Sequence, residues 1–370
     1  TTLFRSYIPE VYKDIDENYG GDIDSYIDNI FNNSVFTSQN KAIEALNNPD
    51  FKMDSRLLLD KINFDEGTVS IGGQSYKLTN TNFPTLDRNS DDIYKLTDDE
   101  HEIISGLREN FLSSVNLQAH VDFLYKKGTA YTCHNGTLLF HANVPLEEDG
   151  SFKRITFEGD TYSGKDYFDY VDRRARRAYF DRNIEDLDFM YFLWCGLLSP
   201  TAGREFRTFE RAFVEDKTTW KEPADPYYNL IDDPQLCDNI LAEFGLDSSG
   251  HIINGHVPVR KGESPIKAGG KAVVIDGGFS TPYHEKTGIS GYTLVSNSRG
   301  FRLLRHQKIA DVKLALAENK DIESTAETVE ILSRHMTVGD TDHGQGIRDE
   351  IIGLHKLLLA YQSGTIQPRN

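Results

Sequence analysis

Two stretches of this 370-residue chain share one sequence pattern: an apolar β-like run is followed by a histidine and then by a turn. The histidines are His141 and His256, so far apart in the sequence that only the fold can bring them together. A strand that carries a histidine into a turn holds the imidazole at a sheet edge, where binuclear metal sites collect ligands. A lone strand-end histidine is more often bonded to a backbone carbonyl, but the repeated order favours two metal ligands.

Composition limits the class of protein. With 38% hydrophobic and 11% aromatic residues, we expect a globular chain. No apolar run approaches the roughly 20 residues of a membrane span and no signal-peptide pattern is present, so we expect no membrane partner. Cys133, Cys195 and Cys237 show no CxxC spacing, which argues against a disulfide framework and favours the cytoplasm. A net charge of −18 repels a phosphate backbone, so we expect no nucleic-acid partner.

The hydrophobic pattern predicts an α+β fold with strands in two clusters, at 128–145 and 250–305. An Asn-Gly turn at Asn135 and Gly136, between two apolar runs, is a strong hairpin signal in the first cluster. A capping-box sequence begins the helix predicted from residue 97. We expect helices at 1–62, 97–123, 161–198, near 310–335 and at 345–362, and a second hairpin at 67–78.

A cluster of cations follows His256 directly. Four basic residues fall within twelve positions, in a chain whose net charge is −18. An anionic substrate would need such a local positive pocket, and Arg and Lys both suit phosphate. The alternative is a solvated loop whose lysines serve solubility. We therefore expect the substrate-binding residues to be Arg260, Lys261, Lys267 and Lys271.

Two other charged segments have simpler interpretations. The arginine-rich segment 173–177 has aspartates four residues before two of its arginines, which indicates an ion-paired helix rather than a nucleic-acid patch. The acidic segment 340–343 resembles a small metal cluster, but Asp and Thr before a helix are more often caps.

The chain resembles, nearly end to end, the class III fructose-1,6-bisphosphatases of Firmicutes and related bacteria. The resemblance lies in long blocks: MDSRLLLD at 53–60, NFPT at 82–85, FLYKKG at 123–128, LLFH at 138–141, NGHVPV at 254–259, IDGGFS at 275–280 and DTD at 340–342. These enzymes are similar to calcineurin-like metallophosphoesterases. The resemblance implies a hydrolase of gluconeogenesis that removes the 1-phosphate of fructose 1,6-bisphosphate, giving fructose 6-phosphate and phosphate. It also implies a binuclear Mn²⁺ cofactor, with His141 and His256 on different metals.

The resemblance also implies a finer fold class. The chain would be the C-terminal half of a calcineurin-like metallophosphoesterase β-sandwich, with a large helical insertion and a helical C-terminal tail. Residues 1–125 would be a mainly helical region with a small hairpin. Residues 126–305 would be the second half of the sandwich, with a helical insert near 161–245, and residues 306–370 the C-terminal helices.

Three motifs of the family's metal site are absent from these 370 residues: Asp-x-His, Gly-Asp-x-x-Asp-Arg and Gly-Asn-His-Asp. We therefore expect the C-terminal part of the enzyme, with an incomplete metal site, no catalytic residue of its own and no activity alone. We also expect a homo-oligomer, and completion of the site by a neighbouring chain is a separate hypothesis. Two alternatives stay open: a non-catalytic oligomerisation or regulatory fragment, and a metallophosphatase for a phosphoprotein or a dinucleoside polyphosphate.

Overall fold

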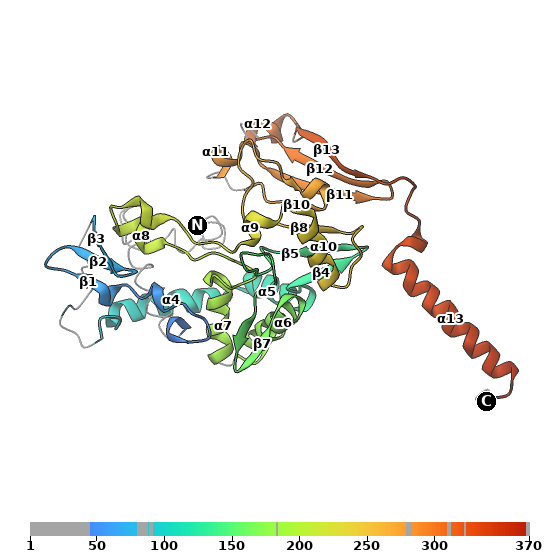
Figure 1. Ribbon diagram of the computed structural model, residues 1–370, viewed down its shortest axis with the longest axis horizontal. Helices are drawn as coiled ribbons and strands as arrows, with labels where there is room; N and C mark the ends of the chain where they lie inside the picture. Colours follow the sequence, from blue (N-terminus) through green and yellow to red (C-terminus); the bar gives the residue numbers. More distant parts are fainter. Residues whose placement is uncertain are drawn as a thin grey trace. The chain divides into compact units, whose positions relative to one another are not determined.

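The computed structural model describes residues 45–79, 88, 92–182, 184–278, 283–308, 312–321 and 323–367 (Figure 1). Contacts separate two compact units. The first contains the described residues up to Ala130 together with Ala142–Tyr228, and the second contains Tyr131–His141 and the described residues from Asn229 onward. The helix expected before residue 45, the motif at 82–85 and the last two residues of the 275–280 motif lie outside the described residues.

The first unit consists of helices and short hairpins. The hairpin expected at 67–78 is confirmed, since β2 pairs antiparallel with β3 around Gly72 and Gly73, both at positive φ. The helix expected at 97–123 is confirmed as two helices that meet at Ser114. The helix expected up to residue 62 is wrong beyond residue 47, where only 3-10 turns occur. The elements are η1 (Asp54–Arg56), η2 (Leu59–Lys61), β1 (Ile62–Asn63), β2 (Thr68–Ile71), β3 (Gln74–Lys77), α4 (Asp98–Ser113), α5 (Val115–Lys127), β6 (Ile155–Phe157), β7 (Asp160–Tyr162), α6 (Gly164–Phe180), α7 (Ile184–Cys195), α8 (Thr208–Phe213) and η3 (Lys217–Trp220).

Aromatic side chains fill one core of the first unit, between α6, α7 and the β6–β7 hairpin. Phe157, Phe189 and Phe192 are fully buried, and the Phe157 and Phe189 rings meet edge to face at 5.6 Å between centroids. The arginine-rich segment lies on α6. Its Arg176 pairs with Asp172 at 2.7 Å, one helical turn earlier, so the ion-paired interpretation is confirmed.

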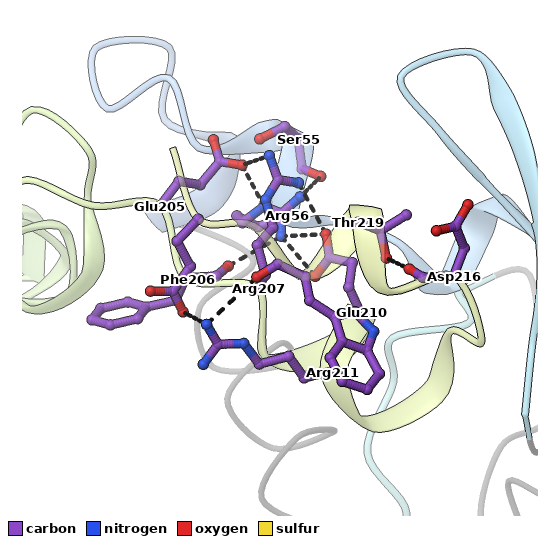
Figure 2. A network of polar contacts seen from close by, with 11 residues as sticks. Ser55, Arg56, Glu205, Phe206, Arg207, Glu210, Arg211, Asp216 and Thr219 are labelled. Carbon is purple, nitrogen blue, oxygen red and sulfur yellow. Dashed lines mark hydrogen bonds and ion pairs between the residues drawn. The ribbon is translucent and has the colours of Figure 1, made fainter. Parts of the chain in front are cut away.

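A buried carboxylate joins α8 to η1 in the same unit. Figure 2 shows Glu210 between the guanidinium groups of Arg56 and Arg207. The nitrogen–oxygen distances are 2.8 Å to Arg56 and 2.9 Å to Arg207, and the Glu210 side chain has no exposed surface. Glu205 adds a second carboxylate, 2.6 Å from Arg207. The burial of Glu210 is therefore compensated by charge pairing on two sides.

The second unit is built on a five-stranded sheet in the order β4-β5-β8-β10-β9. Its first two strands form the hairpin predicted around Asn135 and Gly136, whose φ values of 48° and 74° suit a tight two-residue turn. β5, β8 and β10 run parallel to one another, so their carboxyl ends meet at one edge. The strands are β4 (Tyr131–His134), β5 (Thr137–Phe140), β8 (His251–Asn254), β9 (Ile266–Lys267) and β10 (Ala272–Val274).

A second sheet of three antiparallel strands, in the order β11-β12-β13, shares a core with the first. Ile253 and Val273 of the five-stranded sheet cluster with Tyr292 and Leu303 of the three-stranded one. Short helices and one long helix complete the unit. The elements are α9 (Tyr227–Leu230), which begins in the first unit, α10 (Pro234–Glu243), η4 (Ala268–Gly270), α11 (His284–Thr287), β11 (Gly291–Asn297), β12 (Gly300–His306), α12 (Val312–Ala317), β13 (Ser324–Ile331), η6 (Val338–Asp340) and α13 (Asp342–Gln362).

The tail differs from the sequence prediction in one respect. The helix expected near 310–335 is wrong over its second half, because β13 occupies Ser324–Ile331 and pairs with β12. Among the described residues of that segment, α12 is the helical part. The helix expected at 345–362 is confirmed as α13.

Several small sheets together with many helices confirm the α+β class. Cys133, Cys195 and Cys237 are free thiols in the structure. Within the described ranges we find no helix of the length and apolarity that a bilayer crossing requires.

Candidate functional site

Three parallel strands of the second unit are followed, at the same sheet edge, by side chains of metal-binding type. His141 comes directly after β5, His256 two residues after β8, and Asp276 two residues after β10. Ligand sites of sheets with parallel strands lie outside the carboxyl ends of those strands. This edge is therefore the candidate site.

The two histidines predicted from the sequence meet at this edge. Nε2 of His141 lies 3.1 Å from Nδ1 of His256, with the ring planes inclined at 67°. A main-chain bond reinforces the approach, since the N–H of Gly255 donates to the carbonyl of His141 at 2.9 Å. The backbone and the side chains thus bring the same two loops together.

His256 occupies a strained backbone position. Its φ is +68°, and the N–H of Val257 donates to the carbonyl of Gly255 at 2.8 Å. A hydrogen bond between residues i and i+2 across a positive φ describes a γ-turn of the rare, strained kind. Such outliers cost on the order of 1–3 kcal/mol and gather at binding and catalytic sites. The turn fixes the main chain of His256, from which its side chain projects.

Opposing effects act on His141. Desolvation by the surrounding chain lowers the pKa of the imidazole, while the charge of Asp276 raises it by a smaller amount. The net effect favours the neutral ring, which is the form that binds metal ions. Asp276 is itself held in place, because its Oδ1 accepts the N–H of Gly278 at 2.9 Å and its carbonyl accepts the N–H of Val259.

The two histidine nitrogens lie at hydrogen-bonding distance, and two neighbouring ligands of one metal ion would have a similar separation. With metal–nitrogen bonds of about 2.0–2.1 Å, neighbouring ligand atoms lie about 3.0–3.4 Å apart, and the observed distance is 3.1 Å. Among the described residues, however, no three His, Cys, Asp or Glu side chains cluster closely enough to hold an ion. A metal ion at this edge would therefore need ligands in addition to those of the described residues.

The four predicted cations divide between the two ends of the sheet. Arg260 and Lys261 directly follow Val259, which bonds to Asp276, so they lie at the edge of the histidine pair. Lys267 pairs with Ala272 at the amino end of β10. Lys271, at the same end, bonds to the carboxylate of Asp238 and to the carbonyl of Ser248. The structure therefore brings two of the four cations to the histidine edge.

An open cavity of about 760 Å³ lies elsewhere in the second unit, between its two sheets and η6. Its described lining includes Leu139, Ile253 and Phe301 but no Lys or Arg. A phosphate ester would find no positive partner in that lining. The histidine edge is the better candidate for a phosphate site.

The acidic segment 340–343 serves as helix capping. Thr337 and Asp340 form a reciprocal capping box, and Asp340 pairs with Arg334 at 2.8 Å. Thr341 caps α13 by accepting the N–H of Gly344. The interpretation of this segment as caps is confirmed.

Comparison with known proteins decides the family. A model of the Firmicute fructose-1,6-bisphosphatase family matches residues 17–363. The chain belongs to this family. Relatives named fructose-1,6-bisphosphatase class 3 include one from Clostridium acetobutylicum, 46% identical over 341 residues that cover 90% of this chain and 51% of the relative. Another, from Clostridium tetani, is 46% identical over 328 residues that cover 86% of this chain and 49% of the relative.

The chain spans about half the length of these curated fructose-1,6-bisphosphatases. No solved structure matches the chain. Membership of this fructose-1,6-bisphosphatase family confirms the resemblance on which the sequence interpretation rested.

Asp276 is the site residue that sequence reasoning missed. It belongs to the Ile275–Gly278 segment that carried part of the family resemblance, yet it had no predicted role. The available signal was its position, because an aspartate directly after an apolar strand falls at the same edge as the two histidines once the strands are parallel.

Proposed function

We propose that this chain contributes metal-ligand and phosphate-binding residues to an enzyme that hydrolyses the 1-phosphate of fructose 1,6-bisphosphate, releasing fructose 6-phosphate and phosphate. The observation that supports this proposal most directly is the 3.1 Å distance between the ring nitrogens of His141 and His256, at the edge where the parallel strands end. Support comes from the family match over residues 17–363 and from the names of the relatives.

His141 and His256 would hold one or both ions of a Mn²⁺ pair, which when bound polarises phosphoryl oxygens and lowers the pKa of a water molecule. The chain's own contribution is orientation. The pairing of β5 with β8 and the γ-turn at His256 fix the main chain from which the two rings project. The neutral state of His141, favoured by desolvation, leaves its ring nitrogen able to act as a ligand.

Arg260 and Lys261 would bind substrate phosphate. Both side chains are exposed, and both residues lie in the loop that continues from His256. The guanidinium of Arg260 would suit a bidentate contact with phosphate oxygens. Lys267 and Lys271 lie at the other end of β10, and Lys271 is paired with Asp238, so we propose no substrate contact for either.

The shared core of the five-stranded and three-stranded sheets supports the finer fold, half of a calcineurin-like β-sandwich. The Mn²⁺ identity, the place in gluconeogenesis and the homo-oligomeric state are proposed from the resemblance. A cytoplasmic location is proposed from the three free thiols.

The first experiment measures phosphate release from fructose 1,6-bisphosphate with added Mn²⁺. It compares this chain alone with the same chain extended at its amino end to include the three missing motifs. Activity in the extended protein alone supports the proposal and the expected incomplete site. Inactivity of both proteins overturns the bisphosphatase assignment.

A second experiment separates the cations. In the extended protein, Arg260→Ala should raise KM for fructose 1,6-bisphosphate at least tenfold, because a phosphate contact is lost. Lys271→Ala should leave KM unchanged, since this lysine is bonded to Asp238. A larger KM effect from Lys271→Ala would reverse the assignment of the two ends of the sheet.

A further inference from the structure

The strand β10 is followed by a turn in which the carboxylate of Asp276 is held in place. Oδ1 of Asp276 accepts the N–H of Gly278 at 2.9 Å, which makes an Asx-turn. This Asx-turn is packed closely against β11, because a Cβ added at Gly277 would lie 2.5 Å from the Cα of Gly291. One oxygen of the carboxylate is therefore fixed relative to the main chain at the sheet edge.

The Asx-turn lies against the loops that carry the two histidines. The N–H of Val259, three residues after His256, donates to the carbonyl of Asp276 at 2.9 Å. A Cβ built on Gly255 would lie 3.7 Å from the Cβ of Asp276 and 3.8 Å from the carbonyl oxygen of His141. Asp276 therefore lies where the loops after β5, β8 and β10 meet.

The carboxylate of Asp276 acts on the histidine pair through space. Its charge raises the pKa of His141, against the larger lowering that desolvation causes. Among the described residues no three His, Cys, Asp or Glu side chains are placed to hold an ion together. The carboxylate therefore lies outside the ligand set that the two imidazoles could share. Asp276 is half-buried, and Coulomb attraction is screened less there than in bulk water.

A divalent ion at this edge would be stabilised by a negative charge nearby. Two neutral imidazoles contribute none, and Arg260 and Lys261, in the loop after His256, would repel a cation. The carboxylate of Glu263, in the same loop, accepts the N–H of Arg260 at 3.3 Å. Asp276 is the carboxylate whose charge reaches His141.

We propose that Asp276 is a positioning residue for the metal ion: its carboxylate favours a divalent cation on His141 and His256 without becoming a ligand. In metal sites, polar groups that lie behind the ligands change metal affinity about 10- to 100-fold. This inference rests on the proposed function, since it takes the histidine edge as the metal site. It adds a role for the charge of Asp276 that is separate from the role of the Asx-turn in the fold.

Two variants separate the charge from the Asx-turn. Asp276→Asn keeps Oδ1 as the acceptor for the N–H of Gly278 but removes the charge, so Mn²⁺ affinity should fall about tenfold. Asp276→Glu keeps the charge on a longer side chain that does not form an Asx-turn, so the affinity should stay close to that of the wild type. A purely structural role for Asp276 predicts the opposite order, with the larger loss in Asp276→Glu.

Electron paramagnetic resonance titration of free Mn²⁺ measures these affinities, on the chain and on its N-terminally extended form. Asp247→Asn is the matched control. It makes the same chemical change at an exposed aspartate that precedes the amino end of β8, at the opposite end of the sheet, and should leave the affinity unchanged. Circular dichroism melting checks that each variant is folded.

The outcomes separate this inference from the proposed function. Absence of Mn²⁺ binding by the wild type in both forms would overturn the proposed metal site, and the role of Asp276 with it. If the wild type binds Mn²⁺, an unchanged affinity in Asp276→Asn, or an equal loss in Asp276→Asn and Asp276→Glu, would overturn the role of the charge alone. An equal loss in Asp247→Asn would do the same, because it would assign the effect to the net charge of the protein.

Discussion

Nε2 of His141 and Nδ1 of His256 lie 3.1 Å apart, although 115 positions separate these residues in the sequence. The parallel pairing of β5 with β8 produces this approach, because it brings the carboxyl ends of both strands to one edge. The γ-turn sets the main chain of His256 at this edge. Strained main-chain positions of this kind gather at binding and catalytic sites, which supports the proposal that this edge binds a ligand.

Removal of either ring should therefore weaken metal binding. His141→Ala and His256→Ala should each reduce Mn²⁺ affinity at least tenfold, about 1.4 kcal/mol, because the ion loses a nitrogen ligand. Electron paramagnetic resonance titration of free Mn²⁺ measures this, on the chain and on its N-terminally extended form. His134→Ala is the control, since that exposed side chain lies on β4, outside the edge. Equal affinity in all three variants would exclude the histidine pair as a metal site.

The buried carboxylate of the first unit should be a strong determinant of stability. Glu210→Ala leaves the guanidinium groups of Arg56 and Arg207 without their shared partner, so we expect a loss of about 3–5 kcal/mol. Arg211→Ala is the matched control. It breaks a pair with Glu222 whose arginine is 53% exposed, and exposed pairs contribute about 0–1 kcal/mol.

Urea unfolding followed by tryptophan fluorescence measures both losses, because Trp194 and Trp220 both lie in the first unit. If Glu210→Ala proved no more destabilising than Arg211→Ala, the network would be dispensable to the fold.

Local sequence signals predicted most of the fold. The Asn135-Gly136 turn specified its hairpin because both residues tolerate positive φ, and the Thr341 cap marked the start of α13. β13 was missed because its pairing with β12 is non-local. Its Val329 packs on the shared core while Ile331 is 77% exposed, so the strand lacks a clear apolar face.

The candidate site was predictable only in part, because some of its features depend on the local sequence and others on non-local strand pairing. The strand-histidine-turn order is local, so it indicated His141 and His256 correctly as neighbours. The four cations near His256 looked equivalent in the sequence. Lys267 and Lys271 lie at the opposite end of the sheet because β9 pairs antiparallel with β10. The partner of Lys271, Asp238, lies 33 positions earlier in the sequence.

In the first unit Gly203 lies so close to a neighbouring side chain that we expect it not to tolerate substitution. Gly203 has a φ of +58°, and a Cβ there would lie 2.3 Å from Oδ1 of the buried Asn143. Gly203→Ala therefore adds a steric clash to backbone strain. Gly159→Ala is the control for strain alone, because its φ is +88° and no atom lies within 4 Å of its added Cβ.

We expect Gly159→Ala to cost about 1–2 kcal/mol, and Gly203→Ala to cost a further 1–3 kcal/mol, roughly the penalty of overpacking. The same urea titration gives both values. Equal losses would mean that the Asn143 side chain moves aside without cost.

Asp225 should make the stability of the first unit depend on pH. Its Oδ1 accepts the N–H of Tyr227 at 2.9 Å and that of Leu146 at 3.2 Å, and the side chain is buried. Burial raises the pKa of Asp225 from 3.8 to about 6, against the opposing effect of these N–H donors. The protonated acid is therefore the form that the folded state prefers.

The sign of the effect follows from linkage. Because the pKa is raised on folding, the stabilisation is complete below about pH 4 and is lost as the pH rises through about 6. The loss amounts to about 3 kcal/mol between these limits. Asp225→Asn keeps Oδ1 as an acceptor but cannot ionise, so its stability relative to wild type should rise by about that amount from pH 4 to pH 7 and stay level above. Urea unfolding of both proteins at each pH unit tests this, and parallel pH profiles would show that Asp225 does not titrate in this range.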